Sequence, residues 1–504
     1  ITANPAKFSG IPIQHEGRYL KITADNIGLY LYEIMAVDTS TGEKLPMTLI
    51  SGDGEKLIDE QFVIDGHPTW RDGMYFDEIY HARTGLEQLN SLRGEEPSSI
   101  YEVSHPPLGK VFMTLSIAIF GMTPFAWRLP GAIAGVLMLP GMYMLGKLFT
   151  KKRHLAAMPM LLMALDCMHF AQTRIATIDS FVALFIIWAT YFMFRYAYTN
   201  VYEKPFSKAM KYLFLSGLFM GLACASKWTG CYAGLGLAVI FFISLYRQVR
   251  AGKQAETYLY KQDALISKAA AAWKKTSIKT LLLCVLFFVI IPFAIYCLSF
   301  YPVFAGTPGG LTISKVLRAN ANMLSYHSAS GLGADHPFAS KWYMWPLSQK
   351  PIYYYSAPRI DGTGSAIWSF GNPAVWWLST AALIIIIASW VLKRCGKNNI
   401  IADDKDSCGM FIVIAYFAQY LPWVFVPRGT YIYHYFTALP FAIMALVFVL
   451  DRIDEKHAKL SKILSYGIIT LAALMFIGFF PYISGERVST KWFDLMRWFP
   501  NIWY

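Results

Sequence analysis

Two adjacent carboxylates, Asp77 and Glu78, stand in an aromatic stretch at residues 75–81. A carboxyl group that is partly withdrawn from water has a raised pKa, which suits it to act as a general base near neutral pH. The structural alternative is that both acids mark the start of a helix, where negative charge is favourable. The pair therefore predicts either proton abstraction from a weak nucleophile or a helix N-terminus.

Three cations, Arg128, Arg174 and Lys227, each lie near one end of an apolar run. Any one of them is explained as a long side chain that extends from a helix end to the membrane surface. Three such cations on the same side of the membrane as a carboxylate pair predict a binding site for a phosphate group. A base can activate a hydroxyl nucleophile, and fixed cations can stabilise a phosphate as it leaves. Together these groups predict an enzyme that transfers a group from a phosphate to a hydroxyl.

Metal chemistry has little support in the sequence. Glu78 and His81 have i, i+3 spacing, but one such pair without further ligands is weak evidence for a metal site. Cations of the protein can neutralise a leaving phosphate in place of a divalent ion. We therefore expect no cofactor and no metal.

The composition indicates a membrane protein. Of 504 residues, 55% are hydrophobic and only 15% are charged, whereas about a quarter is typical of soluble domains. The net charge of +13 is spread over short loops between apolar runs, which argues against nucleic-acid binding. Most of the seven cysteines lie in or beside apolar runs, so we expect no disulfide framework. The chain opens at Ile1 in polar sequence, and we expect it to be a piece of a longer protein.

Apolar runs long enough to cross a bilayer predict about ten transmembrane helices. They are expected near 126–147, 155–172, 177–195, 210–226, 229–246, 278–300, 373–392, 408–426, 433–450 and 463–481. Residues 106–121 are apolar but short, which predicts a re-entrant or membrane-surface helix. This membrane domain covers 73–504, with external loops at 73–125 and 301–372.

The charges of the connecting loops set the orientation. Alternate loops hold 24 Lys and Arg residues on one side and eight on the other. The positive-inside rule places the richer side in the cytoplasm, so Asp77, Glu78 and the three cations face outward. We expect a multi-pass protein of the cell membrane with an extracytoplasmic site.

Residues 1–72 are polar and predict a β-rich extracytoplasmic segment that resembles the end of a β-sandwich. Residues 19–23 alternate in the manner of a strand, and 38–42 have the composition of a turn.

Several motifs of this chain, taken in order, resemble those of the protein O-mannosyltransferase family. That family has the GT-C glycosyltransferase fold. The similarity covers residues 76–483. The motifs that carry it are Asp77-Glu78, His105-Pro106-Pro107-Leu108-Gly109-Lys110, Arg128 before Pro130, Lys227-Trp228, a His336-Pro337 to Trp345-Pro346-Leu347 loop, Gly371-Asn372-Pro373, and Tyr433-His434-Tyr435. The loop 301–372 is too short for the β-trefoil domain of eukaryotic members, so the resemblance is to a bacterial form.

The resemblance implies a polyprenyl-phosphate mannose donor and Ser or Thr hydroxyls of secreted proteins as acceptors. It implies inversion at the anomeric carbon, with Asp77 as the base and Glu78 holding the acceptor. Arg128, Lys227 and Arg174 are the candidate ligands of the donor phosphate. The expected site-shaping residues are His81, His105, Lys110, Asp179, His336, Trp345 and His434.

Other functions remain open from the sequence. A GT-C enzyme of this kind could instead move a lipid-linked sugar onto a lipid or a wall polymer. An oligosaccharyltransferase is disfavoured because Trp376-Trp377 is followed by Leu378 rather than Asp. A transporter is expected to place charges at the bilayer midplane, whereas these lie at helix ends. A non-catalytic sugar-binding receptor is a further alternative.

Overall fold

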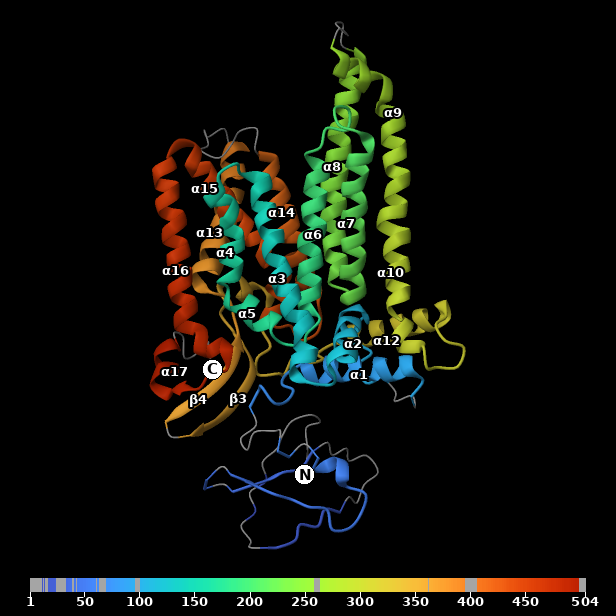
Figure 1. Cartoon of the computed structure of the whole chain (residues 1–504). Helices are drawn as coiled ribbons and strands as arrows, with labels where there is room; N and C mark the ends of the chain where they lie inside the picture. The colour runs from blue at the N-terminus through green and yellow to red at the C-terminus, as the bar shows by residue number, and fades with distance from the viewer. Residues whose placement is uncertain are drawn as a thin grey trace. The chain divides into compact units, whose positions relative to one another are not determined.

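The computed structural model describes residues 11, 13, 17–23, 33–38, 40–41, 43–59, 61–62, 69–95, 100–257, 263–360, 362–394 and 406–497. The chain divides into two compact units, Ile1–Tyr80 and His81–Tyr504. The division falls in the first turn of helix α1 (Glu78–Arg93). Figure 1 shows the elements of both units.

The first unit contains a short antiparallel pair, β1 (Ala36–Val37) and β2 (Lys44–Leu45), followed by a 3-10 turn at Glu55–Leu57. The turn between the strands agrees with the sequence, because Asp38 accepts hydrogen bonds from both the backbone and the hydroxyl of Ser40. The strand expected at residues 19–23 is wrong: these residues are described and form no strand. Alternation alone is insufficient, since a strand requires a hydrogen-bonded neighbour.

The second unit is a helical bundle (Figure 1). After α1, its helices are α2 (Leu108–Phe120), α3 (Pro124–Phe149), α4 (Arg153–Ala164), α5 (Cys167–Thr173), α6 (Asp179–Ala197), α7 (Phe206–Ser226), α8 (Gly230–Thr257), α9 (Ala264–Val285), α10 (Ile291–Ser299), α11 (Tyr301–Phe304), α12 (Ile313–Ser328), α13 (Pro373–Arg394), α14 (Asp406–Tyr420), α15 (Leu439–Lys456), α16 (Ala458–Ser484) and α17 (Thr490–Met496). Short 3-10 helices lie at Trp342–Leu347 (η3), Leu421–Phe425 (η4) and Ile432–Thr437 (η5).

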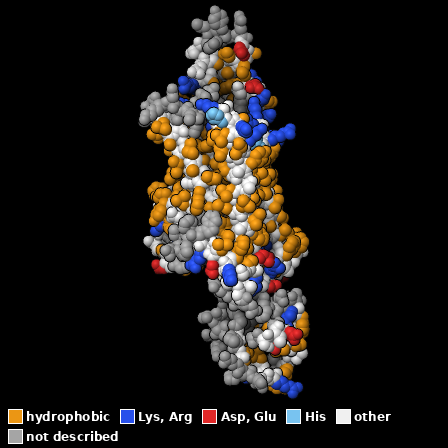
Figure 2. Space-filling model, turned by 90° about the vertical axis from the view of Figure 1, so that its left-hand side faces the viewer, with side chains coloured by type: hydrophobic (Ala, Val, Ile, Leu, Met, Phe, Trp, Pro, Cys, Tyr) orange, Lys and Arg blue, Asp and Glu red, His pale blue; other side chains and the backbone are white. Residues whose placement is uncertain are grey.

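Eight helices in the described part of the chain are long and apolar enough to cross a membrane, and nine spans result if the bent pair α4 and α5 counts as one. Helix α15 is almost wholly buried, but its last turns carry Asp451, Arg452, Asp454 and Glu455. Figure 2 shows a belt of hydrophobic side chains over one face of this unit, with Lys and Arg gathered beyond its upper end. The polytopic α-helical class is confirmed, while the count of ten spans stays a prediction.

Two expected spans are interrupted, each for a local reason. The span expected at 155–172 bends by 57° between α4 and α5. There Asp166 caps α5 by accepting a bond from His169 N (3.0 Å) and binds Trp376 Nε1 (2.8 Å), which replaces the missing helical bonds. The span expected at 278–300 contains a π-helical turn at Leu286–Ile290 just before Pro292. Proline cannot donate to the preceding turn, so the helix widens there.

One end of the bundle carries the elements that matter for the site. Helices α1, α2 and α12 lie there, as do α5 and the hairpin of β3 (Ile352–Ile360) and β4 (Thr363–Ser369), which pairs on with β5 (Val488–Ser489) (Figure 1). The expected external loop 301–372 is therefore largely structured. The short helix expected at 106–121 is α2, which is 13 residues long.

Helix α12 has two contrasting faces. Val316 and Met323 are buried, and the intermediate residues Asn320 and His327 lie on the same side. Another face exposes large apolar side chains, namely Ile313, Leu317 and Leu324. An exposed apolar stripe beside a buried one is typical of a helix that lies in a membrane interface.

Candidate active site

The acidic pair lies where the first unit ends. Asp77 directly precedes α1, and its backbone carbonyl accepts a hydrogen bond from Tyr80 N (3.1 Å). Glu78 is the first residue of α1; its side chain is buried, and Oε2 accepts a bond from Tyr75 N (3.3 Å). Phe76, just before the pair, has φ of +50°. That backbone conformation is unfavourable for a large side chain, and such strain is found most often at functional positions.

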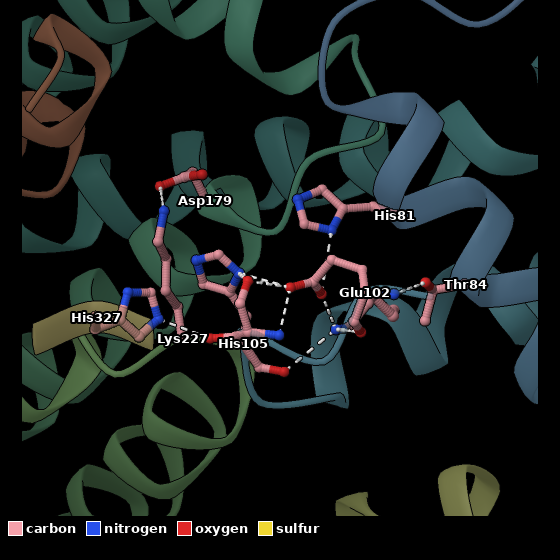
Figure 3. A network of polar contacts seen from close by, with 9 residues as sticks. His81, Thr84, Glu102, His105, Asp179, Lys227 and His327 are labelled. Atoms are coloured by element: carbon pink, nitrogen blue, oxygen red, sulfur yellow. Dashed lines mark hydrogen bonds and ion pairs between the residues drawn. The ribbon is translucent and has the colours of Figure 1, made fainter. Parts of the chain in front are cut away.

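The second unit contains a buried polar network around Glu102, a residue that the sequence motifs do not include (Figure 3). Lys110 forms an ion pair with Glu102 Oε2, and His105 Nδ1 lies 3.0 Å from Oε1. Ser104 Oγ also donates to this carboxylate. Lys110 Nζ further binds the backbone carbonyls of Glu102 (3.0 Å) and His105 (3.2 Å). Glu102 thus holds His105 and Lys110 of the His-Pro-Pro-Leu-Gly-Lys segment, and the preceding Ser104, in one arrangement.

Helix α1 supports this network from one side. Thr84 Oγ1 accepts a bond from Glu102 N (3.2 Å), and Glu87 Oε2 accepts one from Tyr101 N (2.7 Å). Arg83 bonds to Glu87 (2.8 Å) and lies over the ring of Tyr101. The segment 101–105 is therefore fixed along α1 by backbone and side-chain contacts.

His81 approaches the same carboxylate from the first turn of α1. Its Nδ1 is 4.0 Å from Glu102 Oε2, and among the described residues this buried atom has no hydrogen-bond partner. A buried polar atom without a partner costs free energy, so it often marks a place that a ligand or water completes.

The network keeps its histidines neutral. Burial lowers the pKa of His81 to about 3, and burial lowers that of His105 to about 4 despite the bond to Glu102. Burial alone would raise the pKa of Glu102, but the charge of Lys110 and the bond from His105 hold it well below its usual value. A carboxylate only accepts, so His105 carries its proton on Nδ1 and leaves Nε2 as an acceptor.

His327 of α12, which the sequence motifs also miss, extends this site. Its Nε2 lies 2.6 Å from the carbonyl of Ser104, so that nitrogen donates and Nδ1 is left as an acceptor. Its ring lies 5.1 Å from that of His105 and 5.8 Å from that of Trp228. Burial lowers the pKa of His327, so this ring too is neutral near pH 7.

Lys227 lies at the corner between α7 and α8 and is buried. Its Nζ donates to Asp179 Oδ1 at 2.7 Å, which brings together two residues that the sequence singled out (Figure 3). It also lies 5.6 Å from the centre of the Tyr433 ring. An ammonium group has three donors, so the bond to Asp179 leaves donors for a second anion.

Aromatic residues from the 3-10 helices η3, η4 and η5 pack against one another. His434 lies 4.1 Å from the ring of Trp423, and its Nδ1 accepts a bond from Tyr431 N (3.0 Å). Trp345 is fully buried and lies 5.9 Å from His434. His336 is exposed and packs edge-on against Tyr431. Trp345 and His434 thus belong to one buried aromatic cluster, whereas His336 is exposed beside Tyr431.

The other two candidate cations have different surroundings. Arg174 Nη1 donates to the carbonyls of Ile483 (3.1 Å) and Ser484 (2.6 Å), at the C-terminal end of α16. Those bonds fit the anchoring role that was the alternative for a single cation. Arg128 is partly buried in the second turn of α3 and lies 5.9 Å from the ring of Trp127.

Within the described ranges, no group of three or more His, Cys, Asp or Glu residues is arranged to hold a metal ion. The arrangement instead offers fixed cations, neutral imidazoles and a buried carboxylate network at one end of a membrane bundle. Together the fold and these residues define a polytopic membrane protein with buried charged and polar groups at one end of its bundle.

Comparisons with known proteins narrow this class. The family model "Dolichyl-phosphate-mannose-protein mannosyltransferase" matches residues 70–306, and the model for the C-terminal four-transmembrane region of protein-O-mannosyltransferase matches residues 312–503. The two matches together span most of the chain, which belongs to the protein O-mannosyltransferase family. The family predicted from the sequence motifs is thereby confirmed.

Bacterial relatives align along nearly the whole chain. The polyprenol-phosphate-mannose–protein mannosyltransferases of Mycobacterium tuberculosis and Mycolicibacterium smegmatis are each 24% identical to it. These alignments cover 84% and 88% of this chain and 86% and 90% of the relatives. One chain of the Saccharomyces cerevisiae protein O-mannosyltransferase Pmt1–Pmt2 complex bound to the sugar donor superposes with a TM-score of 0.69 at 14% identity, covering 86% of this chain and 90% of that one. This last likeness confirms the expected fold.

Proposed function

We propose that this protein transfers mannose from polyprenyl-phosphate mannose to Ser or Thr hydroxyls of exported proteins. The observation that carries the proposal is the pair of family matches over residues 70–306 and 312–503. The relatives that align with most of the chain bear the name of this activity. The donor and acceptor classes both follow from that name, and the site chemistry is consistent with them.

In the proposed reaction, the acceptor hydroxyl oxygen attacks the anomeric carbon while the bond from that carbon to the phosphate oxygen breaks. Asp77 takes the hydroxyl proton, and Glu78 holds the acceptor. The bonding electrons leave with the phosphate, and attack from the opposite face inverts the anomeric centre. A hydroxyl is a weak nucleophile, which is why a base is needed beside it.

Lys227 and Arg128 are the proposed ligands of the donor phosphate. Lys227 is buried and already oriented by Asp179, so little rearrangement is needed to bind a phosphate oxygen. The bonds of Arg174 to α16 support a structural role for that residue instead. We keep the expectation that these cations act without a metal, which predicts full transfer in the presence of EDTA.

The neutral imidazoles are the proposed partners of sugar hydroxyls. His105 Nε2 and His327 Nδ1 are acceptors in the tautomers that their other bonds require, and a hydroxyl can donate to each. A neutral acceptor suits this task better than a carboxylate, because it does not repel the donor phosphate.

We place the reaction at the extracytoplasmic face. The support is the excess of Lys and Arg in the loops on the other side of the predicted topology. Acceptor proteins would then meet the site after they leave the cytoplasm, and the lipid donor would reach it from the outer leaflet.

The test is transfer by the purified protein in vesicles, with polyprenyl-phosphate mannose and a Ser/Thr-rich peptide. The expected product is peptide heavier by one hexose, made by the parent and made about 10² or more times slower by an Asp77→Asn variant. A matched donor that carries glucose in place of mannose tests whether the protein is specific for mannose. If only glycolipid or polymer gains the sugar while the peptide stays unmodified, the protein-acceptor proposal is wrong.

A further inference from the structure

The corner between α7 and α8 brings two thiols together. Cys224 lies in the last turn of α7 and Cys231 in the first turn of α8, and their Sγ atoms are 3.5 Å apart. Only residues 227–229 separate the two helices. Cys231 is exposed and Cys224 is half-buried, so a reagent can reach the pair.

The backbones at this corner are also close together. A Cβ at Gly230 would lie 2.5 Å from Cys224 N and 2.5 Å from the carbonyl carbon of Ala223, so only glycine fits there. Disulfides need Cα atoms about 4.4–6.8 Å apart and sulfurs about 2.05 Å apart. The Sγ atoms of Cys224 and Cys231 are roughly 1.5 Å farther apart than in a disulfide, so the two side chains must rotate to form the bond.

The corner carries part of the site. Lys227 and Trp228 lie between the two cysteines in sequence, and Lys227 holds Asp179. Trp228 Nε1 donates to Tyr296 Oη (3.0 Å), which in turn donates to Asn320 Oδ1 of α12 (2.6 Å). Whatever fixes the corner therefore fixes the position of the proposed phosphate ligand.

We propose that Cys224 and Cys231 are a modification site, oxidised to a disulfide that holds the Lys227–Trp228 corner in place. The proposal rests on the outward orientation given under the proposed function, because disulfides persist in oxidising spaces. It revises the expectation that the chain uses no disulfide. Its geometry does not depend on which sugar the protein transfers.

The oxidant is a disulfide, carried by a thiol–disulfide oxidoreductase or by a small molecule such as oxidised glutathione. The Cys231 thiolate attacks one sulfur of that disulfide, whose S–S bond breaks, and a mixed disulfide forms. The Cys224 thiolate then attacks the Cys231 sulfur and displaces the second reagent sulfur. Two thiol protons and two electrons end on the reagent, which leaves reduced.

The first measurement detects the disulfide directly and does not depend on transferase activity. The full-length protein in vesicles is treated with oxidised glutathione, unfolded, alkylated with N-ethylmaleimide and weighed by mass spectrometry. The parent should lose two alkylations relative to the dithiothreitol-reduced sample and yield a peptide cross-linked between Cys224 and Cys231. Cys231→Ser should yield no such peptide, whereas Cys284→Ser, which changes a cysteine in α9, should behave like the parent. Seven alkylations in the oxidised parent would overturn the proposal.

A second measurement asks whether the bond acts on the site. Because a fixed corner holds Lys227 ready for the phosphate, reduction should raise the KM for the lipid donor at least threefold in the parent. The KM of Cys231→Ser should not respond to dithiothreitol. A disulfide that forms without changing the donor KM would refute its link to Lys227. Absence of any transfer would instead count against the proposed function and leave the cross-link result standing.

Discussion

Lys227 Nζ and Asp179 Oδ1 are 2.7 Å apart, and both side chains are buried. A pair of this kind is costly to break because each charge depends on the other for its solvation. Asp179 begins α6 and Lys227 follows α7, so the ion pair also joins two helices. The same lysine is thus both a structural link between helices and the proposed ligand of the donor phosphate.

Lys227→Ala should reduce kcat/KM for the lipid donor about 10- to 100-fold, because a charged hydrogen bond contributes roughly 1.5–3 kcal/mol. Asp179→Asn is the matched variant, since it keeps an oxygen for the lysine and removes the competing charge. It should bind the donor at least as tightly as the parent. The measurement is the donor dependence of peptide mannosylation, and a parent-like donor KM in folded Lys227→Ala would place the phosphate elsewhere.

Arg128→Lys separates a phosphate ligand from an anchoring cation. A guanidinium that binds phosphate through two N–H groups is not replaced by an ammonium, so Arg128→Lys should lose nearly as much donor affinity as Arg128→Ala. Arg174→Ala serves as the comparison. It should lower the melting temperature by removing the bonds to Ile483 and Ser484, with little change in donor KM. Full rescue by Arg128→Lys would indicate that Arg128 only anchors α3.

Asp77→Asn should slow transfer by about 10² or more while donor binding stays the same, which is the usual scale for loss of a general base. Asparagine keeps the size and hydrogen-bonding ability of the side chain but cannot accept the proton. Single-turnover rates with saturating donor measure the effect, and donor binding is measured separately. A folded Asp77→Asn protein with the parent's rate would exclude Asp77 as the base.

Acidification should destabilise the folded protein before it protonates the histidines in place. The pKa values of His81 and His105 lie at about 3 and 4 in the folded chain, below the usual 6.5. The unfolded chain therefore binds protons first, and stability that is complete above about pH 6.5 is lost as the pH falls. Each histidine should contribute about 2 kcal/mol of this loss between pH 7 and pH 5. The carboxylate of Glu102 adds a loss in the same direction at lower pH, since its pKa is also lowered.

Thermal melting in vesicles between pH 7.5 and 5 measures this dependence. His105→Gln should show a flatter pH profile than the parent, even if it is less stable at neutral pH. Surface-exposed His457→Gln is the control and should keep the parent's slope. Equal slopes in the parent and in His105→Gln would contradict the assignment of a neutral buried His105.

The orientation is tested by labelling. In a cysteine-free background, Gly331→Cys should react with an impermeant maleimide in intact cells, whereas Gln254→Cys should react only after the membrane is permeabilised. Both positions are exposed, so access to the reagent depends on the side of the membrane. The reverse pattern would refute the outward site together with the topology.

Much of the bundle could be predicted because apolar length and loop charge act locally. The interruptions within the helices were harder to predict from the sequence. The bend at Asp166 depends on bonds to Asn372 and Trp376, which lie about 200 residues away. No window of sequence around Asp166 contains those partners. The wider turn before Pro292 does have a local signal in the sequence, namely the proline itself.

The site shows the same division. The motifs pointed to His105, Lys110 and Lys227, which the structure places in buried polar contacts, whereas Glu102 belongs to no motif and is surrounded by Lys110 and His105 only in the folded chain. Its two-residue separation from Ser104 and its burial next to a polar motif were the available signals. His327 was missed because its link to Ser104 joins residues 223 apart.

Helix α12 connects the exposed apolar surface of the protein to the candidate active site. Ile313, Leu317 and Leu324 face outward, while Asn320 and His327 reach Tyr296 and the Ser104 carbonyl on the inner side. A shift of this helix within a membrane interface would therefore move the two contacts that flank Trp228. We therefore expect the rate of transfer to depend on bilayer thickness and lateral pressure. Rates measured in micelles and in bilayers should differ even when the protein, donor and peptide are the same.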